Sequence, residues 1–224
     1  MTRTLVITGG HGVLGRAVLE AARADGLNLA VVDHARGQTA PDGVLELGGV
    51  DLTDPAAAQQ AMAAVAERFG GVDALLNIAG GFVWQTADDA EPAWDRMFAL
   101  NLKTALNASR AALPFLKQSP EGRIVNVGAN GAVKAAAGMG AYAASKSGVH
   151  RLTESLAEEL KATPVTVNAV LPSILDTEQN RRDMPDADPA KWVQPSDLAR
   201  VMLFLASPES RAITGALIPV TGRV

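Results

Sequence analysis

The sequence predicts an α/β protein: a single-domain, Rossmann-type, doubly wound fold with a parallel sheet of about seven strands and helices on both faces. Three observations support this fold class. Short apolar segments alternate along the chain with longer helical stretches, as they do in proteins with right-handed crossovers around a parallel sheet. Most of the apolar segments lack polar alternation, which is typical of strands buried on both faces. The first segment runs directly into a glycine-rich turn and a helix.

The expected strands are runs rich in β-branched and aliphatic residues. In chain order they are RTLVIT (3–8), NLAVVD (28–33), VLELGGVD (44–51), VDALLNIAG (72–80), GRIVNVGA (122–129), PVTVNAVLP (164–172) and AITGALIPV (212–220). The expected helices lie between them, at 13–24, 54–69, 91–117, 140–162 and 196–206. No linker rich in Pro, Gly or Ser, no charge block and no repeat interrupts this order, so residues 1–224 are expected to form one domain.

Composition excludes several classes of function. The net charge is −4 and the pI is near 5.4, with no basic stripe that could neutralise a row of phosphates, so nucleic acid is not an expected partner. The chain has no cysteine, and His11, His34 and His150 lie far apart in the sequence, so no metal site is expected. No apolar run is long enough for a membrane span or a signal peptide, and a cytoplasmic protein without membrane contact is expected.

The turn after the first strand has the pattern of a dinucleotide site. In TGGHGVLG (8–15), Gly10, Gly12 and Gly15 satisfy G-x-G-x-x-G between a strand and a helix. Glycines there let a pyrophosphate approach main-chain N–H groups at the helix N-terminus. Asp33 ends the second strand 18 residues after Gly15, where a carboxylate would bind the adenosine ribose.

Asp33 also bears on the choice of cofactor. A carboxylate at that position repels a 2′-phosphate, which favours NAD over NADP. NADP remains an alternative because His34 and Arg36 follow directly and a cation there could pair with the phosphate. A second alternative is that Asp33 serves only as a turn residue at the end of its strand.

The only tyrosine of the chain, Tyr142, lies four residues before Lys146 in an expected helix, so both side chains share one face. An ammonium group and a cationic nicotinamide nearby would both lower the pKa of the phenol, which could then exchange a proton with a substrate. By itself such a spacing is also found in pairs on exposed helix faces. The dinucleotide turn in the same chain favours the catalytic interpretation.

Together these motifs resemble those of the short-chain dehydrogenases/reductases, along nearly the whole chain and in the same order. The matching segments are the glycine turn at 8–15, DL at 51–52, NIAG at 77–80, Asn101 in ALNLKTALN, YAASK at 142–146, VNAVLPS at 167–173 and ITGALIPV at 213–220. The resemblance implies an NAD(P)-dependent oxidoreductase that transfers hydride between a nicotinamide and a small-molecule substrate. It also implies a homodimer or homotetramer that pairs through the helices at 91–117 and 140–162.

The resemblance assigns roles to individual residues. Tyr142 would donate or accept the proton, Lys146 would bind the nicotinamide ribose and lower the tyrosine pKa, and Asn101 would support a water relay to Lys146. The residues implied to bind the cofactor are Gly9, Gly10, Gly12, Val13, Leu14, Gly15, Asp33, Asp51, Leu52, Asn77, Ala79, Gly80, Lys146, Pro172 and Thr177.

Two departures from the common family pattern point to a subgroup. Val13 stands where most relatives have a glycine, and Ala129 stands where most have a serine that binds the substrate carbonyl. Both features, and the segment LDTEQNRRDMPDADPAKW (175–192), resemble dihydropteridine reductases. That subgroup reduces a quinonoid dihydropterin, whose conjugated ring accepts hydride with less polarisation of a carbonyl. A damaged site remains the alternative, in which the protein is a catalytically weak NAD(P)-binding sensor or scaffold.

Residues 173–194 show no helix or strand pattern and are expected to form a substrate-binding loop, because long irregular segments often act as lids. Asn180, Arg181 and Met184, together with Ala129, are the expected substrate contacts. The alternative is a solvated loop whose arginines pair with Asp183, Asp186 and Asp188. A substrate-binding loop of this kind is also compatible with a small ketone or a quinone as the substrate in place of a dihydropterin.

Overall fold

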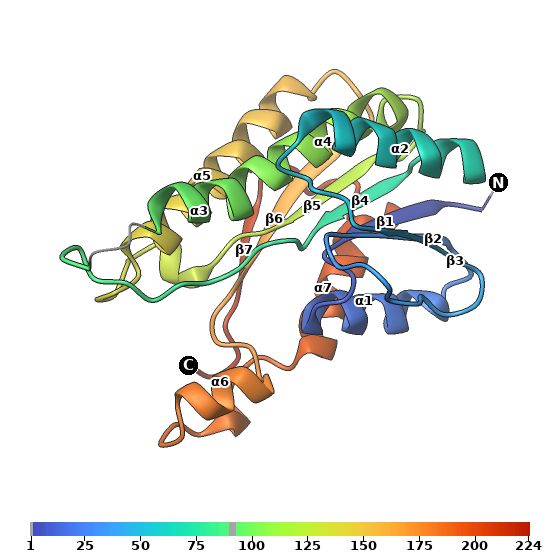
Figure 1. The fold of residues 1–224 in the computed structure, drawn as a ribbon. Helices are drawn as coiled ribbons and strands as arrows, with labels where there is room; N and C mark the ends of the chain where they lie inside the picture. The colour runs from blue at the N-terminus through green and yellow to red at the C-terminus, as the bar shows by residue number, and fades with distance from the viewer. Residues whose placement is uncertain (1, 90–92) are drawn as a thin grey trace.

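The computed structural model describes residues 2–89 and 93–224. Within them, seven parallel strands form one sheet in the order β3-β2-β1-β4-β5-β6-β7 (Figure 1). The strands are β1 (Thr4–Thr8), β2 (Asn28–Asp33), β3 (Val44–Gly48), β4 (Ala74–Asn77), β5 (Arg123–Val127), β6 (Thr166–Pro172) and β7 (Leu217–Val220). The expected single-domain, doubly wound α/β fold is confirmed.

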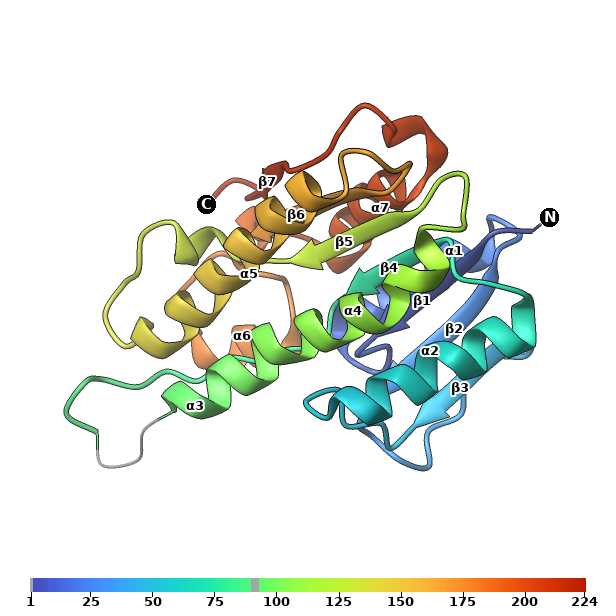
Figure 2. The same cartoon turned by 90° about the horizontal axis from the view of Figure 1, so that it is seen from above.

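Helices cover both faces of the sheet. They are α1 (Val13–Arg23), α2 (Pro55–Phe69), α3 (Trp94–Met97), α4 (Thr104–Leu116), α5 (Gly140–Glu159), α6 (Glu178–Asp183) and α7 (Pro195–Ala206). Figures 1 and 2 show α2, α4 and α5 on one face and α1 and α7 on the other. The two apolar cores match this division, since Met62 and Leu156 belong to one and Val18 and Met202 to the other.

The order of the strands positions the site. The chain adds β2 and β3 on one side of β1 and then returns to add β4 on the other side. The crossovers therefore diverge at the carboxyl ends of β1 and β4, where open parallel sheets leave a crevice for ligands. Helix α1 begins there directly after Gly12, without a side-chain cap, so its first N–H groups are free to bind an anion. By contrast α2 is capped by Asp54, which accepts from the N–H of Ala56.

Six of the seven strands are shorter than the sequence predicts, and the local structure explains where two of them end. The strand expected at 44–51 ends at Gly48, because Gly49 turns the chain with a φ of 75°. The strand expected at 72–80 ends at Asn77, because the next two N–H groups donate to the hydroxyl of Thr8. The strand expected at 212–220 begins at Leu217.

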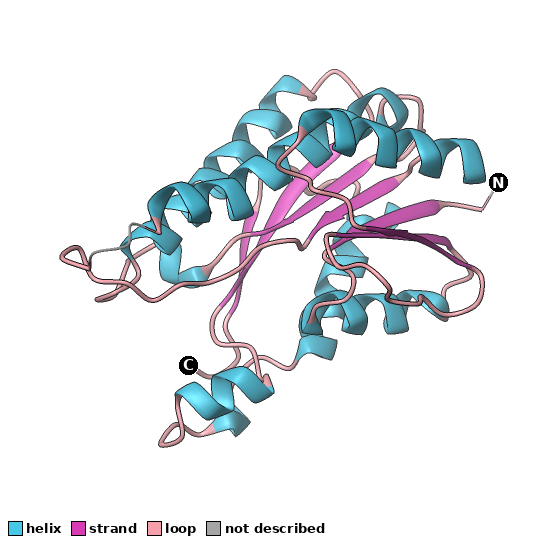
Figure 3. Ribbon diagram, in the orientation of Figure 1, coloured by secondary structure: helices cyan, strands magenta, loops and turns pink. Residues whose placement is uncertain are grey.

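Two further expectations are corrected. The helix expected at 91–117 starts at Trp94, with residues 91 and 92 outside the described part of the chain, and it changes to a π-helix over Phe98–Lys103 before α4. The segment at 173–194 contains α6 and a 3₁₀ turn at Pro189–Lys191, although its sequence shows no helix pattern (Figure 3). A side-chain cap explains α6, since the hydroxyl of Thr177 accepts from the N–H of Asn180. Among the described residues, no helix is both long and apolar enough to span a membrane.

Candidate active site

A cavity of about 450 Å³ lies at the carboxyl ends of the central strands. Its walls come from the turn after β1, the ends of β2 and β4, the residues after β3 and the start of α4. Nine of the expected cofactor residues line it: Gly9, Gly12, Val13, Leu14, Asp33, Asp51, Leu52, Ala79 and Gly80. The sequence motifs therefore meet in one place, at the position where the sheet topology leaves a crevice.

The glycine-rich turn is tightly packed against the rest of the site. A Cβ atom at Gly15 would lie 2.2 Å from the carbonyl oxygen of Gly9, and one at Gly10 would lie 2.4 Å from a methyl group of Val31. Gly9 has a φ of 67°, and its Cβ would lie 2.9 Å from the backbone of Ala79. Gly10 and Gly15 therefore shape the cavity through packing and do not line it, whereas the backbone at Gly12 is open to a ligand. This bare cradle at a helix N-terminus fits a pyrophosphate.

Asp33 closes the cavity at the end of β2. One of its carboxylate oxygens accepts from the N–H of His11 at 3.0 Å, and the other accepts from the N–H of Ala35 at 2.9 Å. It therefore does hold a turn, as the alternative for this residue requires, and it also lines the cavity. His34 lines the cavity as well, whereas Arg36 lies over Gly49.

Asp51 and Leu52 form another part of the wall. Hydrogen bonds from the hydroxyl and the N–H of Thr53 lower the pKa of the Asp51 carboxyl. Leu52 is buried and packs into the core beneath α2 and α4. A charged edge beside an apolar floor suits the adenosine part of a dinucleotide.

Asn77 differs from the other residues expected to bind the cofactor, because its side chain is buried beside the cavity and does not line it. Its amide nitrogen donates to the hydroxyl of Ser109 at 3.0 Å and to the side-chain oxygen of Asn126 at 2.8 Å. These bonds join β4 to α4 and β5. The contribution of Asn77 to the site is therefore to hold in place the strand end that carries Ala79 and Gly80.

Lys146 and Asn101 meet at Gly80. A Cβ atom at Gly80 would lie 2.6 Å from the side-chain oxygen of Asn101 and 3.4 Å from Nζ of Lys146, so only glycine leaves both groups room. Lys146 is 5% exposed, and its Nζ donates to the carbonyl oxygen of Val127 at 2.7 Å. Burial lowers the pKa of this lysine to about 8.

The amide of Asn101 joins the loop after β4 to α5. Its oxygen accepts from the N–H of Gly81 at 2.8 Å, and its nitrogen donates to the carbonyl of Gly81 at 3.1 Å and to the hydroxyl of Ser145 at 3.0 Å. Ser145 in turn donates to the carbonyl oxygen of Tyr142 at 2.7 Å. Asn101 thus connects the segment beside Lys146 to the helical turn that carries the tyrosine.

Tyr142 lies on the first turn of α5, and its ring meets the edge of Phe82 with ring centres 5.0 Å apart. Burial raises the pKa of its phenol to about 12. The expectation of a lowered pKa is therefore not met by the groups of this chain alone, because burial desolvates the phenolate. A further positive charge beside the phenol would be required to lower its pKa.

Pro172 and Thr177 lie at the far end of the site. Pro172 is the last residue of β6, and Thr177 caps α6. Neither lines the cavity, although Leu175 between them does. The sequence motif therefore indicates the correct segment but not the residue that reaches the cavity.

The residues expected to contact substrate are distributed over two segments. Ala129 is buried, and its N–H donates to Nε2 of His150 at 3.3 Å. In the segment 173–194, the amide of Asn180 donates to the carbonyl of Leu175, and Met184 ends α6. Both of these expected contacts on α6 are thus placed by bonds within the segment itself.

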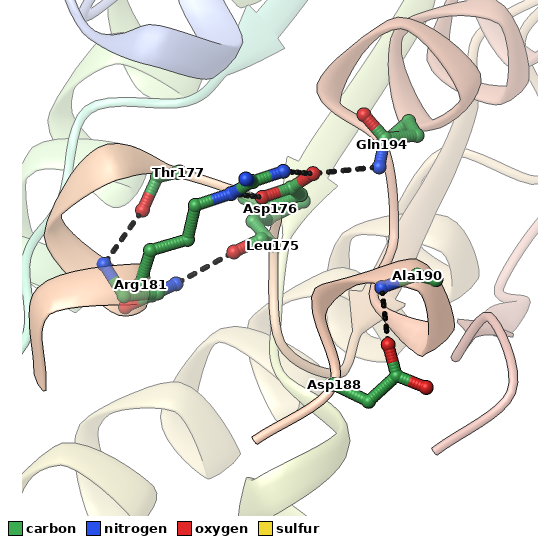
Figure 4. A network of polar contacts seen from close by, with 8 residues as sticks. Leu175, Asp176, Thr177, Arg181, Asp188, Ala190 and Gln194 are labelled. Carbon is green, nitrogen blue, oxygen red and sulfur yellow. Dashed lines mark hydrogen bonds and ion pairs between the residues drawn. The ribbon is translucent and has the colours of Figure 1, made fainter. Parts of the chain in front are cut away.

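Arg181 forms a two-pronged ion pair with Asp176, at 2.6 and 2.8 Å, and Gln194 donates to the same carboxylate at 2.8 Å (Figure 4). This pairing corrects the alternative that the arginines of this segment pair with Asp183, Asp186 and Asp188, because Arg182 instead lies near Glu178. The hydrogen bonds from Arg181 and Gln194 lower the pKa of Asp176 to about 2. The segment is a built substructure with its own polar network.

Sequence reasoning missed several residues of the site. Leu100 and Thr104 line the cavity, and both lie within one helical turn of Asn101. Ser145, which binds Asn101, lies inside the YAASK motif. The closeness of these residues to known motif positions could have identified them from the sequence. The main-chain carbonyl of Val127, which accepts from Lys146, could not have been identified from the sequence, because every residue type has such a carbonyl. Across the described residues, no three His, Asp or Glu side chains gather where they could hold a metal ion.

Known proteins are similar in sequence along nearly the whole length of the chain. The family model described as short chain dehydrogenase matches residues 3–188. D-beta-hydroxybutyrate dehydrogenase of Rhizobium meliloti is 32% identical, over 96% of this chain and 87% of its own length. The 3-oxoacyl-acyl-carrier-protein reductase MabA of Mycobacterium bovis is 32% identical over 99% and 92%, and the FabG reductase of Vibrio cholerae is 29% identical over 98% and 96%.

Proposed function

The chain belongs to the short-chain dehydrogenase family of NAD(P)-dependent oxidoreductases, and we propose that it is an NADH-dependent reductase of a small quinonoid or carbonyl compound. The observation that carries the proposal is the meeting of Asn101 and Lys146 at Gly80, on the wall of the cavity that the glycine-rich turn also lines. A protein that only senses a nucleotide has no chemical need for a buried lysine beside that wall and a tyrosine one helical turn before it.

The residues of this chain divide the work of proton transfer. A nicotinamide bound in the cavity would supply the hydride, and Tyr142 would deliver a proton from its phenol oxygen to the substrate. With a pKa of about 8, Lys146 is mainly charged at neutral pH, and its ammonium group favours the phenolate left by that transfer. Asn101 holds the loop and the helix on which these two groups depend.

NADH is the proposed cofactor because of Asp33. Its carboxylate lines the cavity at the end of β2, where it would accept hydrogen bonds from ribose hydroxyls and repel a 2′-phosphate. Of the two cations that could favour NADP, Arg36 does not line the cavity, whereas His34 does. Binding of NADH at least tenfold tighter than that of NADPH is the expected result.

The first candidate substrate is a quinonoid dihydropterin. Ala129 provides no hydroxyl to polarise a carbonyl, so a conjugated ring that accepts hydride readily is favoured over a simple ketone. The glycine turn with Val13 and the segment 175–192 resemble dihydropteridine reductases and support the same choice. Phe82, which is 54% exposed and touches the ring of Tyr142, offers an aromatic edge to a flat substrate.

A second candidate class follows from the relatives, whose names describe a D-beta-hydroxybutyrate dehydrogenase and 3-oxoacyl-acyl-carrier-protein reductases. Their identity of 32% extends over nearly the whole chain, so a short 3-oxo or 3-hydroxy acyl compound is the competing substrate. The proposed assembly is a homodimer or homotetramer through α4 and α5, which light scattering of the purified protein would test.

The deciding experiment measures NADH oxidation with quinonoid dihydropterin, acetoacetate, an acetoacetyl thioester, small diketones and quinones, with each substrate repeated with NADPH. Fast turnover of the pterin with NADH supports the full proposal. Turnover only of the 3-oxo compounds retains the roles of Tyr142 and Lys146 and replaces the substrate. Tight NADH binding without any turnover favours the alternative of a sensor or scaffold.

A further inference from the structure

A second carboxylate lies beneath the glycine-rich turn. Glu46 is in β3, opposite Val31 of β2, while Asp33 is opposite Gly48 in the same parallel register. Because alternate residues of a strand point to the same face, Glu46 shares the face of the sheet on which Val31 and Asp33 lie. That face is the one packed against α1, since Val31 belongs to the same core as Leu14.

His11 connects the two acids. Its main-chain N–H donates to Asp33, and its Nε2 lies 2.8 Å from a carboxylate oxygen of Glu46. The side chains of His11 and Glu46 are only 12% and 21% exposed, so this pair is largely shielded from water. The middle of the glycine-rich turn is thereby tied to the ends of two strands.

Within the described part of the chain, one oxygen of Glu46 lacks the hydrogen bonds that both oxygens of Asp33 have. Both oxygens of Asp33 accept main-chain hydrogen bonds, whereas the second oxygen of Glu46 is buried and has no partner among the described residues. A buried carboxylate oxygen of this kind repels a further anion more strongly than one in water, because the local dielectric constant is lower.

Glu46 also lies close to Arg36, which follows the end of β2 and could pair with a 2′-phosphate. A Cβ atom at Gly48 would lie 3.5 Å from the carboxylate of Glu46 and 3.9 Å from Cα of Arg36, and one at Gly49 would lie 2.8 Å from Nε of Arg36. Glu46 and Arg36 therefore flank two consecutive glycines. The carboxylate offsets the positive charge that a 2′-phosphate would need there.

We propose that Glu46, held by His11, is a specificity-determining residue that acts with Asp33 to select NADH over NADPH. The inference rests on the proposed cofactor site. A ribose 2′-hydroxyl can donate a hydrogen bond to Asp33, which lines the cavity. A 2′-phosphate would instead bring about two more negative charges near two carboxylates, those of Asp33 and Glu46. Glu46 thus disfavours NADPH while having little effect on NADH.

The test measures the Kd of NADH and of NADPH by calorimetry on the full chain, without substrate. Glu46→Gln removes the charge and keeps an acceptor for His11, and Asp42→Asn makes the same charge change at an exposed site. We expect Glu46→Gln to tighten NADPH binding about tenfold and to change NADH binding less than threefold. Asp42→Asn should leave both values within about twofold of the wild type.

A second variant guards against misfolding. Glu46→Met replaces the carboxylate with an apolar chain of similar length, and it must shift the ratio of the two Kd values in the same direction. If the wild type prefers NADH and both variants at Glu46 keep the wild-type ratio of Kd values, the role of Glu46 is overturned, while the proposed cofactor is retained. A wild-type protein that prefers NADPH, or binds neither nucleotide, would overturn both this inference and the proposed cofactor.

Discussion

Replacement of Lys146 by methionine tests whether this buried lysine of the candidate active site destabilises the fold that holds it. The side chain is 5% exposed, and burial lowers the pKa of its ammonium group from 10.5 to about 8. The charged form is therefore less favourable in the folded chain than in the unfolded chain. Methionine has a similar length and no charge, so the variant removes this cost together with the group that we propose to act in catalysis.

The size of the effect follows from the two pKa values. Their difference corresponds to about 3 kcal/mol at pH 7, where the lysine is charged in the unfolded chain and mainly charged in the folded chain. The variant also loses the hydrogen bond to the carbonyl of Val127, which contributes about 1 kcal/mol. We expect Lys146→Met to raise the free energy of unfolding by about 2 kcal/mol at pH 7 and to lower kcat at least about 100-fold.

The gain should depend on pH in a defined direction. The folded pKa lies below the unfolded one, so the unfolded chain binds more protons between about pH 8 and pH 10.5. The stability of the wild type therefore rises relative to the variant across that window. At pH 10 the electrostatic part has fallen to about 1 kcal/mol, which the lost hydrogen bond cancels.

Urea denaturation at pH 7 and pH 10 without added cofactor measures both effects, with Lys117→Met as the control at an exposed lysine. The control should stay within about 0.5 kcal/mol of the wild type at both values. A variant that is less stable than the wild type at pH 7, or a gain that is the same at pH 10, would refute burial of the charge as the cause.

Three further substitutions probe the site. Tyr142→Phe should keep the Kd of NADH within about threefold and lower kcat about 1000-fold, and near-normal turnover would contradict the role of the phenol. Ala129→Ser should raise kcat/KM for acetoacetate about tenfold and leave that for quinonoid dihydropterin within about twofold, because the added hydroxyl polarises only a simple carbonyl. Arg181→Met should make α6 more susceptible to limited proteolysis at pH 7, since it removes both bonds to Asp176. The pKa of Asp176 is lowered, so the wild type should keep its protection above the ordinary pKa of 3.8 and lose it as the pH falls through about 2.

The sequence predicted the parts of the site that depend on local geometry. Gly15 follows from the close contact of a helix start with the turn before it, and Asp33 follows from its position at a strand end. Lys146 follows from its spacing to Tyr142 on one helix. In each case the requirement lies within a few residues or in one fixed strand–helix unit, so a short motif carries it.

The parts that it did not predict depend on contacts between distant segments. The partner of Arg181 is Asp176 and not one of the acids that follow it, because the short helix α6 turns the arginine back toward the strand-like residues before it. The link from His11 to Glu46 joins residues 35 positions apart, on elements that become neighbours only when β3 adds to the sheet. A local sequence pattern does not show which distant residues become neighbours in the folded chain.

The π-helical turn at Phe98–Lys103 shows how function can depend on such a departure from a regular pattern. Periodicity predicts one continuous helix there. A π-helical turn accommodates one extra residue, so the residues after it face a direction about 100° different from the one they would face in a continuous α-helix. With the wider turn, Asn101 directs one amide to both polar atoms of Gly81 and to Ser145. Two backbone bonds and one hydroxyl therefore fix the amide on three sides, beside the glycine that separates it from Lys146. π-Helical turns of this kind are often found at functional sites, and this one carries the asparagine that lies beside Lys146 in the candidate active site.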